Sequence, residues 1–430
     1  MKIFERSLLF ALGFALSGTD SPAIESRSIS TSEELVAAFT EPLDSVTISI
    51  NPGTYHLKPT YRMEPTCGNC QDPEQDVFMS TGLEIRGRRV RITGPTDRGA
   101  VIFTRAGYGL YFTDCEDCSV ENLSITGGVR DPDPNATDAA IVVKRSSVLI
   151  QNCEIRDNIG DSALVARNIV GIMGICGREG SRTTIRDNRI IRNSWDGIAL
   201  YRDAEATITR NVIDGVDKAP SKAAGGGRGV GIGVTWNARA HIERNLVRRY
   251  WKGIGLFVDA EGTVKKNVVE DILTWGMALW DADKGKPVGK FEENVIFRTG
   301  ACGVAITRSQ PGDEPGHFRK NIIVATGRDP RYDSPDLYCY QCAIAKHAAP
   351  DNFEIEENLC FNNRRATDDL PDDDIPEMEF RKAIEPYCTE LATIDVFKES
   401  EFIGQFCADL QRFNLFEHLF REEPKEDEPK

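Results

Sequence analysis

Nine asparagines occupy the same slot of a recurring phrase (apolar, x, x, Asn, apolar), and their spacing limits what this chain can fold into. Neighbouring members lie 22 to 37 residues apart. Repetition on this scale is typical of solenoids, in which each repeat buries its apolar face against the next repeat. We expect the side chains to stack as an amide ladder that pairs the backbone groups of a turn. The nine are Asn122, Asn152, Asn188, Asn211, Asn245, Asn267, Asn294, Asn321 and Asn358.

A glycine-led phrase precedes five of these asparagines, and its alternation predicts a strand. In the first copy, Gly197 to Tyr201, the large apolar residues Ile198 and Leu200 occupy every second position, which is the period of a strand. Short parallel strands that return about every 22 residues predict a parallel β-helix. The other copies begin at Gly231, Gly253, Gly276 and Gly303.

With these repeats, residues 115–363 resemble the right-handed parallel β-helix proteins of the pectin-lyase-like superfamily. The N-terminal part is similar as well: Thr31 to Phe39 reads as a capped amphipathic helix, followed by the strand Val46 to Ile50 and the turn Asn51 to Tyr55. The resemblance implies an all-β, right-handed parallel β-helix with an N-terminal helical cap. The superfamily contains lyases, hydrolases, epimerases and non-catalytic surface proteins, so the reaction stays open.

The chain divides into segments by composition. A basic start and an apolar run predict a signal peptide, and therefore a secreted or periplasmic protein; no other segment is apolar enough to span a membrane. Apolar residues at helical spacing near the C-terminus predict a small α-helical cap on the end of the solenoid. The expected segments are 1–18 (signal peptide), 28–114 (N-terminal cap and first coils), 115–363 (repeats), 364–375 (acidic linker), 376–420 (helical cap) and 421–430 (charged, disordered tail).

Net charge and cysteine content limit the binding partners and the cross-links that we expect. A net charge of −15 argues against nucleic acid, and we expect a monomer. Three of the cysteine pairs have CxxC spacing: Cys67/Cys70, Cys115/Cys118 and Cys339/Cys342. In an exported chain these predict disulfides, whereas zinc would require two pairs to meet in space.

The strand period also predicts which residues face outward. If Ile198 and Leu200 point inward, one outward column holds very small residues and the next holds aromatic ones. A small-residue floor beside aromatic rings is typical of a groove for an elongated polysaccharide, because sugar rings stack on aromatic side chains. The two columns are Ala199, Gly233, Gly255, Ala278, Ala305 and Tyr201, Thr235, Phe257, Trp280, Thr307.

Candidate catalytic residues occupy the slot before the glycine. Asp161 and Asp196 fall in equivalent slots of neighbouring coils, and two carboxylates at such a distance can divide acid and base roles in glycoside hydrolysis. The segment from Asn193 to Ile198 is similar in placement to the catalytic "NTDG" phrase of polygalacturonases, although that family's following Asp-Asp pair has no counterpart here. Lys252 is the predicted charge stabiliser. The alternative role of both aspartates is to form turns.

We therefore expect a carbohydrate-active enzyme, a glycoside hydrolase or a polysaccharide lyase; the alternative is a non-catalytic glycan-binding or surface solenoid. No cofactor is expected and no metal ligand is assigned; the loop from Asp131 to Asp138 is the one candidate for Ca²⁺. The predicted substrate-binding residues are Trp195, Tyr201, Trp251, Phe257, Trp275, Trp280 and Arg228.

Overall fold

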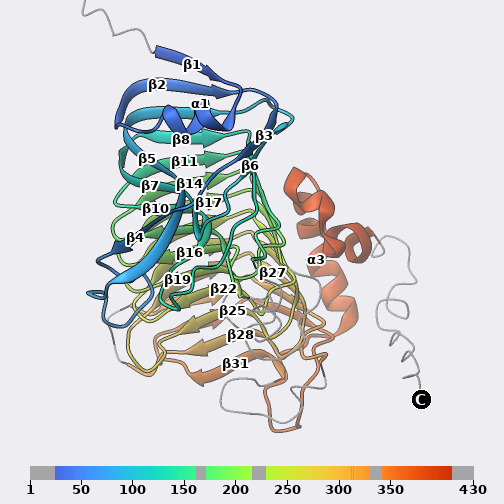
Figure 1. The fold of residues 1–430 in the computed structure, drawn as a ribbon. Coiled ribbons are helices and arrows are strands. Elements are labelled where there is room, and N and C mark those ends of the chain that lie inside the picture. The colour runs from blue at the N-terminus through green and yellow to red at the C-terminus, as the bar shows by residue number, and fades with distance from the viewer. Residues whose placement is uncertain are drawn as a thin grey trace, which may run out of the picture.

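The computed structural model describes residues 25–160, 171–215, 229–310, 312, 314–329 and 341–408. The predicted signal peptide, Asp161, Arg228, Cys339 and the charged tail lie outside these ranges. The described chain winds into a solenoid whose coils stack along one axis (Figure 1). A typical coil contributes three short strands: β16 (Ile198–Tyr201), β17 (Glu205–Thr209) and β18 (Val212–Asp214).

Strands of successive coils pair in parallel along three faces of the solenoid, which we call the first, second and third sheets. The first two are joined through β5 (Val77–Thr93) into one 22-stranded sheet, and the third is a separate 11-stranded sheet. The first sheet holds β7 (Tyr108–Glu116), β10 (Ala139–Lys144), β13 (Met173–Arg178), β16, β19 (Val230–Thr235), β22 (Lys252–Phe257), β25 (Trp275–Trp280), β28 (Cys302–Thr307) and β31 (Cys342–Ala348). The second sheet holds β8 (Cys118–Glu121), β11 (Ser147–Gln151), β14 (Arg182–Arg186), β17, β20 (Arg239–Glu243), β23 (Glu261–Lys265), β26 (Val288–Glu292), β29 (Gly316–Arg319) and β32 (Glu354–Glu356). The third sheet holds β3 (Gly53–His56), β6 (Ala100–Phe103), β9 (Ser124–Thr126), β12 (Glu154–Arg156), β15 (Arg189–Ile191), β18, β21 (Leu246–Arg248), β24 (Val268–Ile272), β27 (Val295–Thr299), β30 (Ile322–Val324) and β33 (Leu359–Phe361).

The inward side chains of the three sheets form one continuous core. Ile198 and Leu200 point into it and are fully buried, as the strand period predicted. The parallel β-helix expected from the repeats is thereby confirmed.

The N-terminal end of the core is closed by a short helix and two strands. Helix α1 (Ser32–Ala37) begins with a capping box, in which Thr31 and Glu34 each bind the other's backbone N–H. Strands β1 (Glu25–Ile29) and β2 (Leu43–Ile50) pair in parallel, and β2 pairs with the long strand β5 (Val77–Thr93).

The asparagine ladder is continuous over seven of the nine predicted residues. From Asn188 to Asn358, each side-chain N–H₂ donates to the next asparagine, with N···O distances of 2.9 to 3.1 Å. The Asn152 side chain instead donates to Asn122 and accepts from Arg98, and neither of these two asparagines bonds Asn188 through its side chain. In these two coils an apolar residue fills the ladder slot. In the coil of Asn152, for example, strand pairing aligns Cys153, and not Asn152, with Asn188. The prediction of one slot for all nine is therefore wrong by one position in these two coils.

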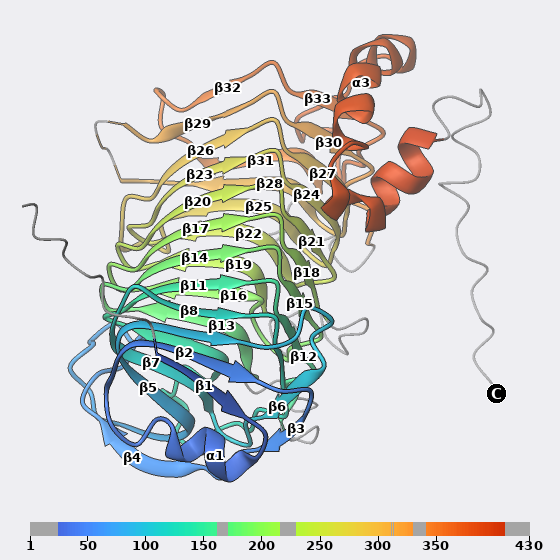
Figure 2. The same cartoon turned by 90° about the horizontal axis from the view of Figure 1, so that it is seen from above.

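The C-terminal helices lie along the third sheet rather than over the end of the solenoid (Figure 2). They comprise α3 (Glu377–Leu391), the 3₁₀-helix η2 (Asp395–Glu399) and the π-helix η3 (Phe402–Cys407), and a disulfide joins Cys388 to Cys407. They pack there because third-sheet strands carry apolar residues on both faces, such as Leu246 and Phe297. Among the described residues, no helix has the length and apolarity needed to cross a membrane.

Candidate functional site

The predicted columns on the outer face of the first sheet are present in the structure. Strand pairing aligns Ala199, Gly233, Gly255, Ala278 and Ala305. The neighbouring column aligns Thr235, Phe257, Trp280 and Thr307. Adjacent members are separated by about 4.8 Å, the spacing of neighbouring strands.

Four aromatic rings of this face surround the ammonium group of Lys252. The Nζ atom lies 4.2 Å from the ring centre of Trp251, 5.4 Å from Phe257, 3.9 Å from Trp275 and 4.4 Å from Trp280. Trp280 also meets Trp275 and Phe257 edge to face. Cation–π attraction is strongest where water is excluded, and Lys252 is 2% exposed. We call these five residues the aromatic cluster.

The small residues of the first column make room for these rings and do not form an open groove surface. A Cβ atom at Gly255 would lie 2.1 Å from the Cζ atom of Phe257, so the ring of Phe257 rests on this glycine. The predicted open floor is thus wrong at this coil: small side chains are needed here because the protein's own aromatic ring covers them. Phe257, Trp251 and Trp280 remain half-buried and keep part of their rings at the surface.

Asp196 lies just before β16, and the residue is 5% exposed. Its Oδ1 atom accepts a hydrogen bond of 2.6 Å from the Val230 N–H. Burial raises the pKa of Asp196 to about 7, although this hydrogen bond, the Tyr201 hydroxyl and the Lys252 charge all oppose the rise. A Cβ atom at residue 229 would lie 2.1 Å from Oδ1, so Gly229 gives the carboxyl group its room.

The structure does not place Asp161 in the slot equivalent to Asp196. β13 pairs with β16 so that Ile175 faces Ile198, and therefore Met173 occupies that slot. The predicted slot requires the strand to follow Asp161 directly, whereas the strand of this coil, β13, begins at Met173. Asp161 and Arg228 themselves lie outside the described residues.

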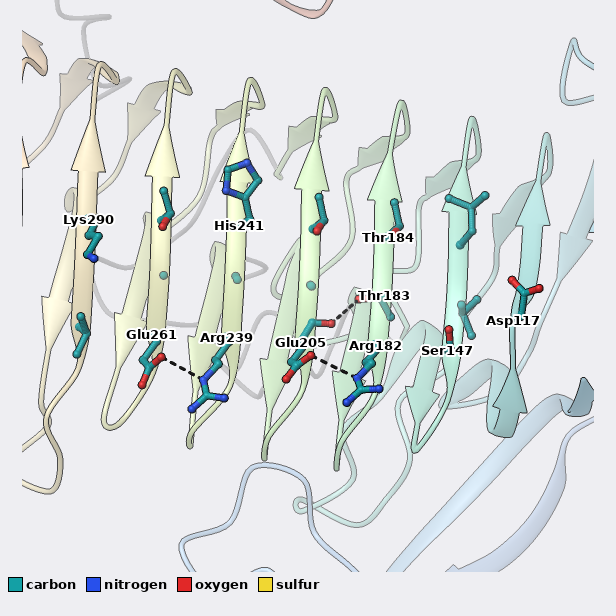
Figure 3. Close-up of a pocket in the computed structure, with 18 of the residues that line it drawn as sticks. Asp117, Ser147, Arg182, Thr183, Thr184, Glu205, Arg239, His241, Glu261 and Lys290 are labelled. Carbon is teal, nitrogen blue, oxygen red and sulfur yellow. Dashed lines mark hydrogen bonds and ion pairs between the residues drawn. The ribbon is translucent and has the colours of Figure 1, made fainter. Parts of the chain in front are cut away.

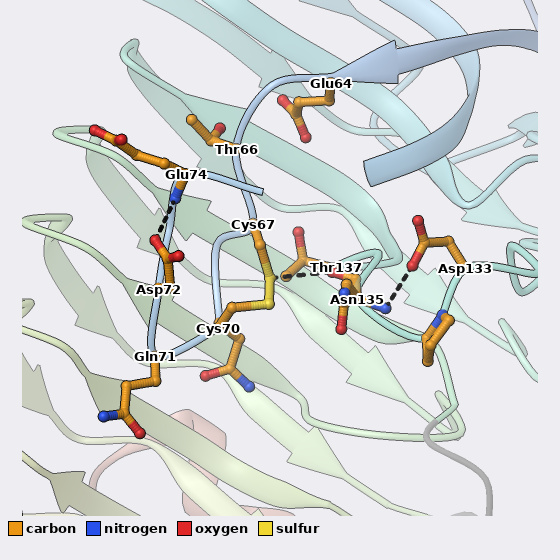
Figure 4. The surroundings of a disulfide bond; sticks show 12 residues. Glu64, Thr66, Cys67, Cys70, Gln71, Asp72, Glu74, Asp133, Asn135 and Thr137 are labelled. Atoms are coloured by element: carbon orange, nitrogen blue, oxygen red, sulfur yellow. Dashed lines mark hydrogen bonds between the residues drawn. A yellow bond between two sulfur atoms is a disulfide. The ribbon is translucent and has the colours of Figure 1, made fainter. Parts of the chain in front are cut away.

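A hairpin covers the N-terminal half of the same face. It consists of β4 (Thr60–Glu64), a connection with a Cys67–Cys70 disulfide, and the start of β5, and we call residues 60–81 the roof hairpin (Figure 4). Cys67, Val77 and Met79 pack with Ala199, Tyr201 and other outward residues of the first sheet. Tyr201 is accordingly 5% exposed, and half-buried Trp195 and Trp236 border this contact.

Two candidate metal sites from the sequence, the Ca²⁺ loop and a CxxC pair, involve residues that contact or belong to the roof hairpin. In the candidate Ca²⁺ loop, the Asp131 carboxylate accepts hydrogen bonds from the backbone and hydroxyl of Ser80, and Asp133 accepts from the backbone of Phe78. Cys67 and Cys70 form a disulfide, one of the two alternatives left open. The disulfide predicted for Cys115 and Cys118 is wrong, because both are free, buried thiols. In the described part of the chain, no three histidine, cysteine or acidic side chains gather as a metal site would require.

The outer face of the second sheet is open and carries a shallow groove of about 830 Å³ (Figure 3). Its lining alternates in charge from coil to coil. Arg182 contacts Glu205 at 3.3 Å, and Arg239 contacts Glu261 at 3.1 Å. The adjacent column carries Thr184, Thr207, His241, Thr263 and Lys290.

Comparison with solved structures finds several β-helix proteins at low identity. An exopolygalacturonase from Thermotoga maritima aligns with a TM-score of 0.46 and 12% identity, over 80% of this chain and 84% of its own. A periplasmic alginate epimerase aligns with a TM-score of 0.39 and 13% identity, over 78% and 84%. The pectate lyase Pel9A aligns with a TM-score of 0.37 and 13% identity, over 78% and 80%. Values this low assign no reaction.

The family comparison covers more than half of the chain. A search of curated proteins finds no match to this chain. The family model described as "right handed beta helix region" matches residues 80–247 and 173–360. The chain therefore belongs to the right-handed β-helix family, with the fold of the pectin-lyase-like superfamily.

Proposed function

We propose that this protein binds an elongated polysaccharide across the outer face of the first sheet. The observation that carries the proposal is the aromatic cluster, in which Trp251, Phe257 and Trp280 keep part of their rings at the surface. Sugar rings present C–H faces that stack on such rings, and Lys252 fixes the rings in position. The cluster spans β22 and β25, so a bound chain would cross the strands along the solenoid axis. Predicted export and the disulfides support binding outside the cytoplasm.

The binding test is a panel of soluble glycans measured by calorimetry. Trp280→Ala should weaken binding about tenfold, because stacking on one ring contributes about 1 to 1.5 kcal/mol. Tyr61→Ala is the matched control, since Tyr61 is an exposed aromatic residue (59%) on the roof hairpin, outside the cluster. Equal losses in both variants, or a chain that binds no glycan, would rule out the aromatic cluster as the site.

Asp196 favours a second candidate function, acid–base chemistry on the bound chain. A carboxyl group with a pKa of about 7 is partly protonated at neutral pH and can give or take a proton. Lys252 is a charged neighbour that the structure brings near it. Hydrolysis would need a second carboxylate, and Asp161 stays a prediction for that role; a lyase would need only a base and a cation. Because Asp196 is 5% exposed, the face must open for a substrate to touch it.

Reducing-sugar release and ultraviolet absorbance of new double bonds separate hydrolase, lyase and non-catalytic binder. We expect Asp196→Asn to abolish turnover while leaving glycan affinity unchanged, because asparagine keeps the oxygen that binds the Val230 N–H. Full turnover in Asp196→Asn would exclude Asp196 as the acid or base. Glycan binding without any turnover in the unaltered protein would leave the non-catalytic function.

A further inference from the structure

Four donors from the outer face of the first sheet converge on one carboxylate. Glu64 Oε1 accepts from Lys144 Nζ at 2.7 Å and from the Tyr111 hydroxyl at 2.9 Å. Glu64 Oε2 accepts from Arg178 Nη1 at 3.0 Å and from the Tyr108 hydroxyl at 3.1 Å. All five side chains are at most 4% exposed. Two donors for each oxygen make a complete carboxylate-binding site.

The donors and the acceptor belong to different parts of the molecule. Tyr108 and Tyr111 are on β7, Lys144 on β10 and Arg178 on β13, three consecutive strands of the solenoid. Glu64 is the last residue of β4, in the roof hairpin. The site is thus part of the sheet, and the roof hairpin supplies its ligand.

The charges of the sheet require an added anion. Lys144 and Arg178 both contact Glu179, at 3.3 and 2.8 Å, so the solenoid alone places two cations beside one carboxylate. Burial raises the pKa of Glu64, but Arg178 and Lys144 lower it by more, and the net pKa lies below the ordinary value. Two buried cations that share one carboxylate are strongly destabilised, so a second anion must occupy the site.

Beyond this site, the roof hairpin contacts the first sheet through the packing of Cys67, Val77 and Met79 and through hydrogen bonds of its connection. β4 pairs only with β5. In the connection, Thr66 accepts hydrogen bonds from Lys144 Nζ at 2.7 Å and, through its carbonyl, from Arg178 at 2.8 Å. Farther along, Asn69 Oδ1 accepts from Trp236 Nε1 at 3.1 Å and the Gln71 carbonyl accepts from Arg202 at 3.3 Å. Residues 71, 72, 74 and 76 are exposed. An edge strand with a solvated connection is the kind of element that opens locally.

The covered site and the aromatic cluster lie on one line along the axis. From Arg178 on β13 to Phe257 on β22 there are three strand spacings, or about 14 Å. A glycan that lies on the aromatic cluster and extends toward the N-terminal coils would therefore meet the roof hairpin.

We infer that Lys144, Arg178, Tyr108 and Tyr111 form a binding site for a carboxylate-bearing sugar unit, and that Glu64 occupies it as an internal substitute until an acidic polysaccharide displaces the roof hairpin. The inference rests on the proposed polysaccharide function for the choice of ligand. No covalent step is involved: one carboxylate replaces another, and the ion pairs of Lys144 and Arg178 are conserved.

Acetate tests the carboxylate site without any glycan. In Glu64→Ala the four donors lose their acceptor, and acetate should raise the melting temperature in a saturable way, compared with chloride at equal ionic strength. The double variant Glu64→Ala/Lys144→Met should lose this response. A Glu64→Ala protein that responds equally to acetate and chloride would overturn the inference. If that variant does not fold, Glu64→Gln, which keeps the side-chain size, carries the glycan test below.

The displacement itself is tested with an oligouronate hexamer and a neutral hexamer of equal length. In the unaltered protein, the oligouronate should increase hydrogen exchange in residues 65–76, and the neutral hexamer should not. Glu64→Gln should bind the oligouronate about tenfold more tightly and the neutral hexamer unchanged. Equal affinity of both proteins for the oligouronate, with no change in exchange, would show that the roof hairpin is fixed. Failure of the proposed function would give a different result. Trp280→Ala would then bind glycans as tightly as the unaltered protein does, whatever the outcome of the acetate experiment.

Discussion

The outer faces of the first and second sheets are built on the same coils but carry opposite chemistry. On the first sheet, cations such as Lys252 and Arg178 are buried under aromatic rings or under the roof hairpin. On the second sheet, Arg182 and Arg239 pair with glutamates of the next coil and stay in water, with 76% and 62% of their side chains exposed. Both faces are built from short parallel strands, so the difference lies in what covers each face. A covered cation must have fixed partners, whereas a solvated one can change them at little cost.

The largest expected effect is a difference in the free energy of unfolding between two arginine substitutions, one on each face. Arg178→Met removes one of the two buried cations that contact Glu64 and Glu179, the other being Lys144, and should lower the free energy of unfolding by about 3 to 5 kcal/mol. Arg182→Met, the matched change on the second sheet, should alter it by no more than about 0.5 kcal/mol. Urea denaturation of both variants measures the comparison. Similar losses would mean that burial does not distinguish the faces.

The next effect concerns Asp196 and depends on pH. A carboxyl group whose pKa is raised to about 7 binds its proton more tightly in the folded state, so its contribution to stability falls as pH rises from about 4 to 7. Asp196→Asn has no such loss. Between pH 4 and pH 8, the stability of Asp196→Asn relative to the unaltered protein should therefore rise by about 2 to 4 kcal/mol. A difference that stays constant over this range would contradict the assigned pKa.

A smaller effect is expected from the two lysines. Lys252→Met keeps the buried stem but removes the ammonium group from the four rings, and should cost about 1 to 2 kcal/mol. Lys290→Met, on the open second sheet, should cost about 0.5 kcal/mol or less, because its contact with Glu314 is exposed. Thermal unfolding, with tryptophan fluorescence as the probe, follows both. An equal cost would place Lys252 among ordinary surface lysines.

The smallest effect tests whether the second sheet's ion pairs stabilise the fold at all. A double-mutant cycle with Arg239→Ala and Glu261→Ala should give a coupling of about 0.2 to 1 kcal/mol at low salt. At 1 M salt the coupling should vanish, because exposed charges are screened over about 3 Å. A coupling that persists in high salt would show that this face is less solvated than its exposure indicates.

Regular features of this molecule were predictable from its sequence. The small-residue and aromatic columns follow from the strand period alone, and the structure confirms that Gly255 aligns with Ala278 and Phe257 with Trp280. The asparagine ladder was predictable except for Asn122 and Asn152, whose coils place an apolar residue in the slot. Periodicity succeeds where each coil meets only its neighbours.

Features that depend on contacts between distant segments were not predictable. The slot of Asp161 was misassigned because two apolar stretches follow Asn152, and only strand pairing decides between them. The roof hairpin lies outside the repeats, so nothing in the spacing indicated that it folds back over Tyr201. A signal was nevertheless present: Lys144 and Arg178 stand at outward positions of the first sheet, where a cation on a flat face calls for an anion from elsewhere.

The asparagine ladder also sets how a molecule of this kind can change in length. Each ladder residue bonds its immediate neighbours, as Asn245 bonds Asn267, and these two are 22 residues apart. Duplicating or deleting one such unit would reconnect the ladder without disturbing more remote coils. The solenoid can therefore be lengthened by copying, while the few residues that face outward are free to acquire a new ligand.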